Sequence, residues 1–204
     1  MHDDSGSSSV QEAFGPPGDA SRHLSFGELE AGVRALPAAA ADEGRLDLIV
    51  RRRPDGVRET LDAMRLSPES GVPGDRWGRK LPNNPDAQLA VMRRDIAEII
   101  ANGQPLTTFG DNFFVDIDIS AKNLPEGTLL RVGGALVVVT PKPHNGCHKF
   151  KARFGQDGLE FVQAKPTRDQ NFRGIYWRCV EGGEVSVGAI IAVVSRPEAP
   201  RSAP

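Results

Sequence analysis

The segment from Leu129 to Thr140 constrains the fold more than any other part of this sequence. Two runs of apolar, β-forming residues, 129–132 and 135–140, are joined by Gly133 and Gly134. A diglycine between two such runs is typical of a tight hairpin turn, because glycine readily adopts positive φ angles. The sequence therefore predicts a β-hairpin at this point.

Further short strands and helices are predicted around this hairpin. A capping box formed by Ser25 and Glu28 opens a helix that extends to Leu36. A second helix over 93–101 ends at Asn102 and Gly103, a C-cap signal. Shorter helical segments are expected at 57–66 and 150–154. The remaining predicted strands cover residues 46–50, 88–92, 113–119, 174–180 and 185–194.

The balance of many short strands and few helices indicates a β-rich (α+β) fold, a barrel or closed sheet rather than a βαβ repeat. We expect one domain over residues 24–195, with its core from about residue 46. Residues 1–23 and 196–204 are rich in Ser, Gly, Asp, Arg or Pro and are expected to be disordered tails.

The composition narrows the possible classes of function. A formal net charge of −2 gives no indication of a nucleic-acid or anionic-membrane surface. Cys147 and Cys179 are the two cysteines, too few for a disulfide scaffold, so a reducing, cytoplasmic setting is expected. The polar, acidic start of the sequence is not expected to be a signal peptide, and no apolar run is long enough to span a bilayer.

A loop after the predicted hairpin carries the chemistry that the sequence indicates most clearly. Residues 141–150 place Cys147 among His144, His148 and Lys149, and two prolines and a glycine break the preceding strand. A thiol among cations ionises more easily, and the thiolate is the form that attacks substrates or binds metal. We therefore regard Cys147 as the main candidate for a catalytic or metal-binding residue.

Several other interpretations of these residues remain open. The alternatives for Cys147 are a core residue, a disulfide partner of Cys179, a hydrolase nucleophile, or a zinc ligand together with His144 and His148. Asp116 and Asp118 lie on the outer face of a half-buried strand or form a metal-binding pair.

Two basic segments are candidate anion-binding sites. Residues 71–80 form a glycine-rich basic loop that can present amides and cations to an oxyanion, although it lacks the ending of a P-loop. The three arginines 51–53 form either an anion site or, more commonly for such a run, a solvated rim.

Four segments together resemble the MOSC domain family, named for the C-terminal domain of molybdenum-cofactor sulfurases. They are GVPGDRWGRK (71–80), GDNFFVDIDIS (110–120), NLPEGTLLRVGGALVVVTPKPHNGCHKF (123–150) and FRGIYWRCVEGGEVSVGAII (172–191). They follow the family's order over residues 46–195, and the chain looks most like small stand-alone bacterial members. Relatives often carry a histidine soon after the Gly-Asp pair, where this chain has Trp77 and Gly78.

The resemblance implies a β-barrel similar to that of pyruvate kinase and a role for Cys147 in sulfur transfer or molybdenum ligation. It also implies a molybdenum cofactor, a molybdopterin whose phosphate needs cations and amides, and at the domain level an association with pyridoxal phosphate. The candidate cofactor-binding residues are Arg76, Arg79, Lys80, Asn112, His144, Lys149 and Arg173. Asp75 and Asn112 match polar positions of the family motif.

Two functions follow from this resemblance. In the first, Cys147 ligates molybdenum, and a small N-hydroxylated compound is reduced with electrons from a separate reductase. In the second, Cys147 carries a persulfide that it receives from a cysteine desulfurase, with no metal bound. Both functions need the same exposed thiol, so the sequence does not separate them.

Overall fold

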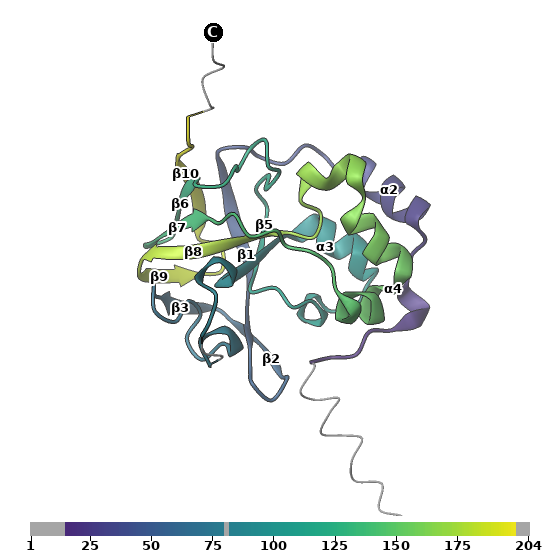
Figure 1. Cartoon of the computed structure of the whole chain (residues 1–204), viewed down its shortest axis with the longest axis horizontal. Coiled ribbons are helices and arrows are strands. Elements are labelled where there is room, and N and C mark those ends of the chain that lie inside the picture. The colour runs from purple at the N-terminus through teal and green to yellow at the C-terminus, as the bar shows by residue number, and fades with distance from the viewer. Residues whose placement is uncertain (1–14, 80–81, 199–204) are drawn as a thin grey trace, which may run out of the picture.

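The structure is a computed structural model that describes residues 15–79 and 82–198. Seven strands of this part of the chain form a closed barrel (Figure 1). All neighbours around it are antiparallel except β4 and β5, and the pairing of β1 with β10 closes it. In barrel order the strands are β10 (Ile190–Ser195), β6 (Leu129–Val132), β7 (Ala135–Val139), β8 (Ile175–Glu181), β4 (Leu89–Arg93), β5 (Phe113–Val115) and β1 (Glu43–Arg52). The β-rich barrel and the predicted hairpin, β6–β7, are confirmed.

Residues 57–66 contain two strands, so the helix predicted there is wrong. β2 (Arg58–Leu61) pairs with β1, and β3 (Ala63–Leu66) pairs with β9 (Gly183–Ser186) in a separate ribbon. Met64 and Leu66 are buried while the residues between and before them are exposed. This period-two pattern over only four residues was too short to separate from a helical pattern.

Apolar residues form two cores, one inside the barrel and one outside it. Phe113 and Val115 point into the barrel, where they pack with Trp177. The residue between them, Phe114, faces outward and packs with Phe109 in the second core. Both faces of β5 are therefore buried, which explains its continuous apolar sequence.

Three helices cover this outer face of the barrel on one side (Figure 1). They are α2 (Phe26–Arg34), α3 (Arg94–Ala101) and α4 (His148–Gln163). The capping box at Ser25 and the left-handed C-cap at Asn102 are confirmed. Short 3₁₀ segments connect the elements: η1 (Ala20–Arg22), η2 (Arg76–Arg79), η3 (Pro85–Ala87), η4 (Leu106–Thr108) and η5 (Lys165–Gln170).

Helix α4 is much longer than the short turn predicted at 150–154. It continues through Gly155, whose φ of 83° introduces a kink between two helical segments. Glycine tolerates this backbone conformation because it has no Cβ atom. A glycine that usually ends a helix therefore bends this one.

Other local differences concern loop residues. The strand predicted over 113–119 ends at Val115. Asp116 then accepts a hydrogen bond from the Arg45 backbone N–H, and Asp118 accepts from the backbone N–H and hydroxyl of Ser120. These carboxylates fasten loops, and the metal-pair interpretation is not supported.

The ends of the described chain also pack against the domain. Residues 15–23, which we expected to belong to a disordered tail, include η1 and contact α4. Arg196 donates hydrogen bonds to Asp42 and Asn123. No helix in the described part of the chain has the length and apolarity needed to cross a membrane.

Candidate functional site

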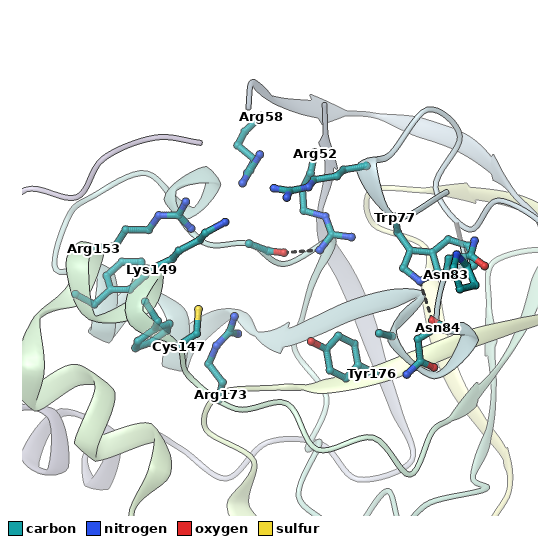
Figure 2. Close-up of a pocket in the computed structure, with 16 residues that line it drawn as sticks. Arg52, Arg58, Trp77, Asn83, Asn84, Cys147, Lys149, Arg153, Arg173 and Tyr176 are labelled. Atoms are coloured by element: carbon teal, nitrogen blue, oxygen red, sulfur yellow. Dashed lines mark hydrogen bonds between the residues drawn. The ribbon is translucent and has the colours of Figure 1, made fainter. Parts of the chain in front are cut away.

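A cavity of about 470 Å³ lies between the end of the barrel, the loop before β4 and the start of α4. Figure 2 shows basic side chains around the Cys147 sulfur, with Trp77, Asn83 and Asn84 at the other end of the cavity. The lining residues are Arg52, Arg58, Arg76, Trp77, Pro82, Asn83, Asn84, Ala87, Gly110, Cys147, Lys149, Phe150, Arg153, Phe154, Arg173 and Tyr176. The cavity thus has a cationic end with a thiol and a neutral end with amides and aromatic rings.

Cys147 occupies the N-cap position of α4 and is exposed at the cavity. Its backbone carbonyl accepts a hydrogen bond from the Lys151 N–H at 3.0 Å. The preceding carbonyl, that of Gly146, accepts from the Gln163 side chain at 2.8 Å. The loop backbone at Cys147 is therefore anchored to both segments of the kinked helix.

The basic half of the lining comes from strands, loops and one helix face. Six cationic side chains line the cavity, and no carboxylate of the described residues does. Lys149 and Arg153 are four residues apart in α4, so they lie on the same face of the helix. The six residues are Arg52, Arg58, Arg76, Lys149, Arg153 and Arg173.

The crowding of these cations affects their ionisation. Burial and the charges of Arg153 and Arg52 lower the pKa of Arg58 to about 10. Burial and the charge of Arg76 lower the pKa of Lys149. Burial also lowers the pKa of Arg153, although the charge of Cys147 opposes this effect. An anionic ligand would relieve this repulsion between cations.

Arg52 is held by a buried carboxylate behind the cavity wall. The Arg52 Nη2 and Nε atoms donate to Asp75 at 2.7 and 3.1 Å. The side-chain amide of Asn112 donates to Asp75 at 3.0 Å and to the Val50 carbonyl at 3.2 Å, and its oxygen accepts from the Ala90 N–H at 3.1 Å. Asn112 does not line the cavity, so its contribution as a predicted cofactor-binding residue is to position Asp75.

Arg173 is held in the same way by Asp111. The Arg173 Nη1 atom donates to both Asp111 oxygens, at 2.9 and 3.0 Å. The Asp111 side chain is fully buried. The guanidinium also lies over the Phe150 ring, 5.1 Å from its centroid. Arg173, predicted from the sequence, is therefore a rigid part of the site.

His144 is not among the lining residues, in contrast to its prediction as a cofactor-binding residue. Its side chain is 5% exposed and packs against the Tyr176 ring, with 4.3 Å between the ring centroids. Burial and the charges of Arg173 and Arg52 hold its pKa well below the usual value, so the imidazole is neutral at neutral pH. His144 supports the wall behind Tyr176.

The glycine-rich loop contributes Arg76 and Trp77 to the cavity. Trp77 is fixed by its backbone N–H, which donates to Asp75 at 2.9 Å, and by its indole N–H, which donates to the Asn84 carbonyl at 2.8 Å. Arg79 ends η2, but its side chain is not described, and Lys80 lies outside the described residues. The predictions for these two residues remain predictions.

Sequence reasoning missed Arg58, Arg153 and Tyr176 as site residues. Arg58 was assigned to a helix that does not exist, and Arg153 to a turn that is part of a longer helix. The three arginines 51–53 have different environments. Arg51 and Arg53 form ion pairs with Glu59, whereas Arg52 lines the cavity. The solvated rim favoured for this run is therefore wrong for Arg52.

The metal and disulfide alternatives gain no support from the described residues. Within residues 15–79 and 82–198, no three His, Cys, Asp or Glu side chains are placed to hold a metal ion, which argues against a zinc site. Cys147 and Cys179 are both free thiols, and Cys179 is 3% exposed in β8. The prediction that Cys179 fills the core is confirmed.

Comparison with solved structures supports the barrel fold. A hypothetical protein of known crystal structure aligns with a TM-score of 0.55 and 20% identity, over 76% of this chain and 70% of that chain. YiiM from Escherichia coli aligns with a TM-score of 0.51 and 21% identity, over 76% and 72%. YuaD from Bacillus subtilis aligns with a TM-score of 0.51 and 16% identity, over 74% and 95%.

Sequence comparison identifies the family. No curated protein matched the sequence in a direct search. The family model of the MOSC domain matches residues 79–192, more than half of the chain. This region contains Cys147, Lys149, Arg153, Arg173 and Tyr176 of the cavity. The chain therefore belongs to the MOSC domain family.

Proposed function

We propose that this protein binds a molybdenum cofactor in the Cys147 cavity and reduces N-hydroxylated compounds there. One observation supports this function above all: an exposed thiol faces a cavity lined by six cations. The thiolate is a soft ligand that suits a high-valent metal. The cations suit the phosphate of a pterin cofactor.

The donor set of the cavity fits such a ligand. The Nε atoms of Arg58 and Arg173 are buried and have no hydrogen-bond partner among the described residues. Buried donors of this kind are normally satisfied, so their environment favours an acceptor supplied from outside the chain. A phosphate, with several strong acceptor oxygens, meets this requirement better than a neutral group.

Different residues of the cavity would bind the phosphate and the metal of the cofactor. Arg58, Lys149 and Arg153 would bind the phosphate, and Cys147 would hold the metal. When bound, the molybdenum would supply the two electrons that break the N–O bond, and a separate reductase would restore them. The overall reaction consumes two protons and releases water.

Tyr176 would orient the substrate at the neutral end of the cavity. Burial and the nearby Asp111 carboxylate raise the pKa of Tyr176. Its hydroxyl is therefore protonated at neutral pH and can donate a hydrogen bond to a substrate oxygen. Trp77 and the amides of Asn83 and Asn84 complete this end.

Elemental analysis tests the proposed function. The protein is produced in a host that makes molybdenum cofactor, as wild type, Cys147→Ser and Cys179→Ala. We expect near-stoichiometric molybdenum in the wild type and in Cys179→Ala, and at least a tenfold loss in Cys147→Ser. Absence of molybdenum from the wild type, in a host whose own molybdoenzymes are loaded, would contradict the proposal.

The second candidate is sulfur transfer, and the exposure of Cys147 favours it. A thiol at the surface end of a cavity can reach the active site of a partner such as a cysteine desulfurase. Mass spectrometry after incubation with desulfurase and cysteine would then show one added sulfur atom on Cys147, removed by a reductant. An unmodified Cys147 beside an active desulfurase would contradict this function.

A further inference from the structure

The segment 15–23, here called the N-terminal strap, runs along α4 and ends beside the cavity. In Figure 1 it is the purple chain next to α4. It precedes the region that the family model matches, which begins at residue 79. The strap therefore lies outside the matched region, and it touches residues of the candidate site.

The strap contacts Arg153 through several hydrogen bonds. The Arg153 Nε atom donates to the Pro16 carbonyl at 3.1 Å, and the His23 Nε2 atom lies 3.1 Å from the Arg153 carbonyl. Gln104 connects the same elements, because it accepts from the Asp19 N–H at 2.8 Å and donates to the Arg153 carbonyl at 3.4 Å. Both the backbone and the side chain of Arg153 are thus fastened to the strap.

The fit between the strap and the cavity wall leaves no space for side chains at two glycines. A Cβ atom at Gly18 would overlap the Arg153 backbone. A Cβ atom at Gly15 would lie 2.5 Å from Arg58 Nη2 and 3.2 Å from Arg153 Nη2. The strap therefore lies close to the guanidinium groups of two cavity arginines at Gly15 and close to the Arg153 backbone at Gly18.

The chemistry of this contact differs from that of the other held arginines. Arg52 and Arg173 are oriented by the carboxylates Asp75 and Asp111, which also neutralise them. The Pro16 carbonyl orients Arg153 but carries no net charge. The strap backbone thus fixes the direction of a guanidinium that lines the cavity.

We propose that the strap is a positioning element of the ligand site, which directs the Arg153 guanidinium toward the phosphate group of an anionic ligand. The inference rests on the proposed function, since it assumes that the cavity binds a phosphate ester. Pro16 and Gly18 act through Arg153 and are positioning residues.

The test measures the binding of inorganic phosphate to the full chain by calorimetry at low ionic strength. Gly18→Ala displaces the strap, and Gln104→Ala removes the hydrogen bonds that join it to Arg153. We expect each variant to bind phosphate about 5–10-fold more weakly than the wild type. Gly27→Ala is the matched control, because a Cβ atom there meets nothing within 4 Å, and it should bind as the wild type does.

A double-mutant cycle separates positioning from general destabilisation. If the strap acts through Arg153, Gly18→Ala should have no further effect on phosphate binding once Arg153→Ala is present. Thermal unfolding identifies any variant that fails to fold. If either Gly18→Ala or Gln104→Ala does not fold, phosphate binding by the other variant tests the proposal.

The possible outcomes distinguish the strap from the site itself. Weaker binding in Arg153→Ala, together with unchanged binding in folded Gly18→Ala or Gln104→Ala, would overturn the positioning role alone. Fully additive effects in the cycle would also overturn it. Unchanged binding in both Arg153→Ala and Arg58→Ala would overturn the phosphate site, and with it the basis of the proposed function.

Discussion

At the scale of single residues, the cavity contains two kinds of cation. Arg52 and Arg173 are paired with buried carboxylates, so their charges are compensated inside the protein. Arg58 instead lies near other cations, and its Nε atom has no partner among the described residues. Such a residue destabilises the folded chain and is typical of a binding site.

Replacement of Arg58 by methionine should therefore stabilise the protein while weakening anion binding. We expect the free energy of unfolding to rise by about 1 kcal/mol at neutral pH, a value reduced for partial contact with solvent. This increase in the free energy of unfolding should become smaller as the pH rises above about 10, because the Arg58 side chain of the wild type then loses its proton in the folded state. Urea unfolding of Arg58→Met measures this, with the exposed Arg65→Met as control, and a variant less stable than wild type would contradict it.

Asp75→Asn should have the opposite effect on stability. It leaves Arg52 buried without its counter-charge, and we expect a loss of about 3 kcal/mol at pH 7. Burial opposes ionisation of Asp75, but the hydrogen bonds and charge of Arg52 outweigh it and lower its pKa. The stability from this pair is therefore complete above the ordinary pKa of 3.8 and is lost as the pH falls below it toward the lower folded pKa.

Chemical unfolding at pH 7 and near pH 3 tests this prediction. The difference between wild type and Asp75→Asn should narrow at the lower pH. Asp55→Asn, which removes the carboxylate of an exposed pair with Arg53, is the control and should change stability by less than about 0.5 kcal/mol. If Asp75→Asn also lowered the free energy of unfolding by less than about 0.5 kcal/mol, the buried Arg52–Asp75 pair would contribute little to stability.

At the scale of elements, helix α4 and strand β8 bring the site together. The first segment of α4 places two pairs of residues with a spacing of four on the cavity side, Lys149 with Arg153 and Phe150 with Phe154. Gly174, just before β8, lets the chain pass close to β4. Its φ is 100°, and a Cβ atom there would overlap the Val91 backbone and lie 3.2 Å from His144 Nδ1.

Gly174→Ala should thus destabilise the fold strongly, by about 3 kcal/mol or more, since backbone strain and overlap act together. Gly188→Ala provides the control, because Gly188 has a similar φ of 83° but no atom within 4 Å of an added Cβ. We expect the control to lose only about 1–2 kcal/mol, the strain alone. Equal decreases in melting temperature in the two variants would show that overlap with the Val91 backbone adds no cost to the backbone strain at Gly174.

At the scale of the whole molecule, charge is distributed unevenly. The chain has a formal net charge of −2, yet six cations line one cavity. The overall net charge therefore gives no sign of this local cluster of positive charge. Ligand binding there should be visible as a change in the stability of the entire domain.

Phosphate at about 100 times its dissociation constant should raise the free energy of unfolding by about 2.7 kcal/mol, because it binds only the folded chain. Sodium chloride at the same ionic strength is the control and should give a much smaller change. Arg153→Ala should reduce the response to phosphate. Equal melting temperatures in phosphate and chloride would contradict a specific anion site.

The sequence predicted those features that depend on neighbouring residues. The β6–β7 hairpin follows from Gly133 and Gly134 between apolar runs, and the ends of α2 and α3 follow from Ser25 and Asn102. Cys147 was identified because its loop follows a strand and is rich in polar residues. Local signals failed at 57–66, where four-residue strands resemble a helix, and at Gly155, which bends α4 rather than ending it.

The sequence by itself thus determined most strands, the helix caps and the place of Cys147 in a loop after a strand, because backbone propensities and side-chain periodicity act over a few residues. Only the tertiary structure decided that β1 and β10 close the barrel, and that Arg58 and Arg153 meet beside Cys147. It also buried His144 and brought the N-terminal strap to α4. These features depend on contacts between residues far apart in the chain, which packing of the whole barrel selects and no local pattern specifies.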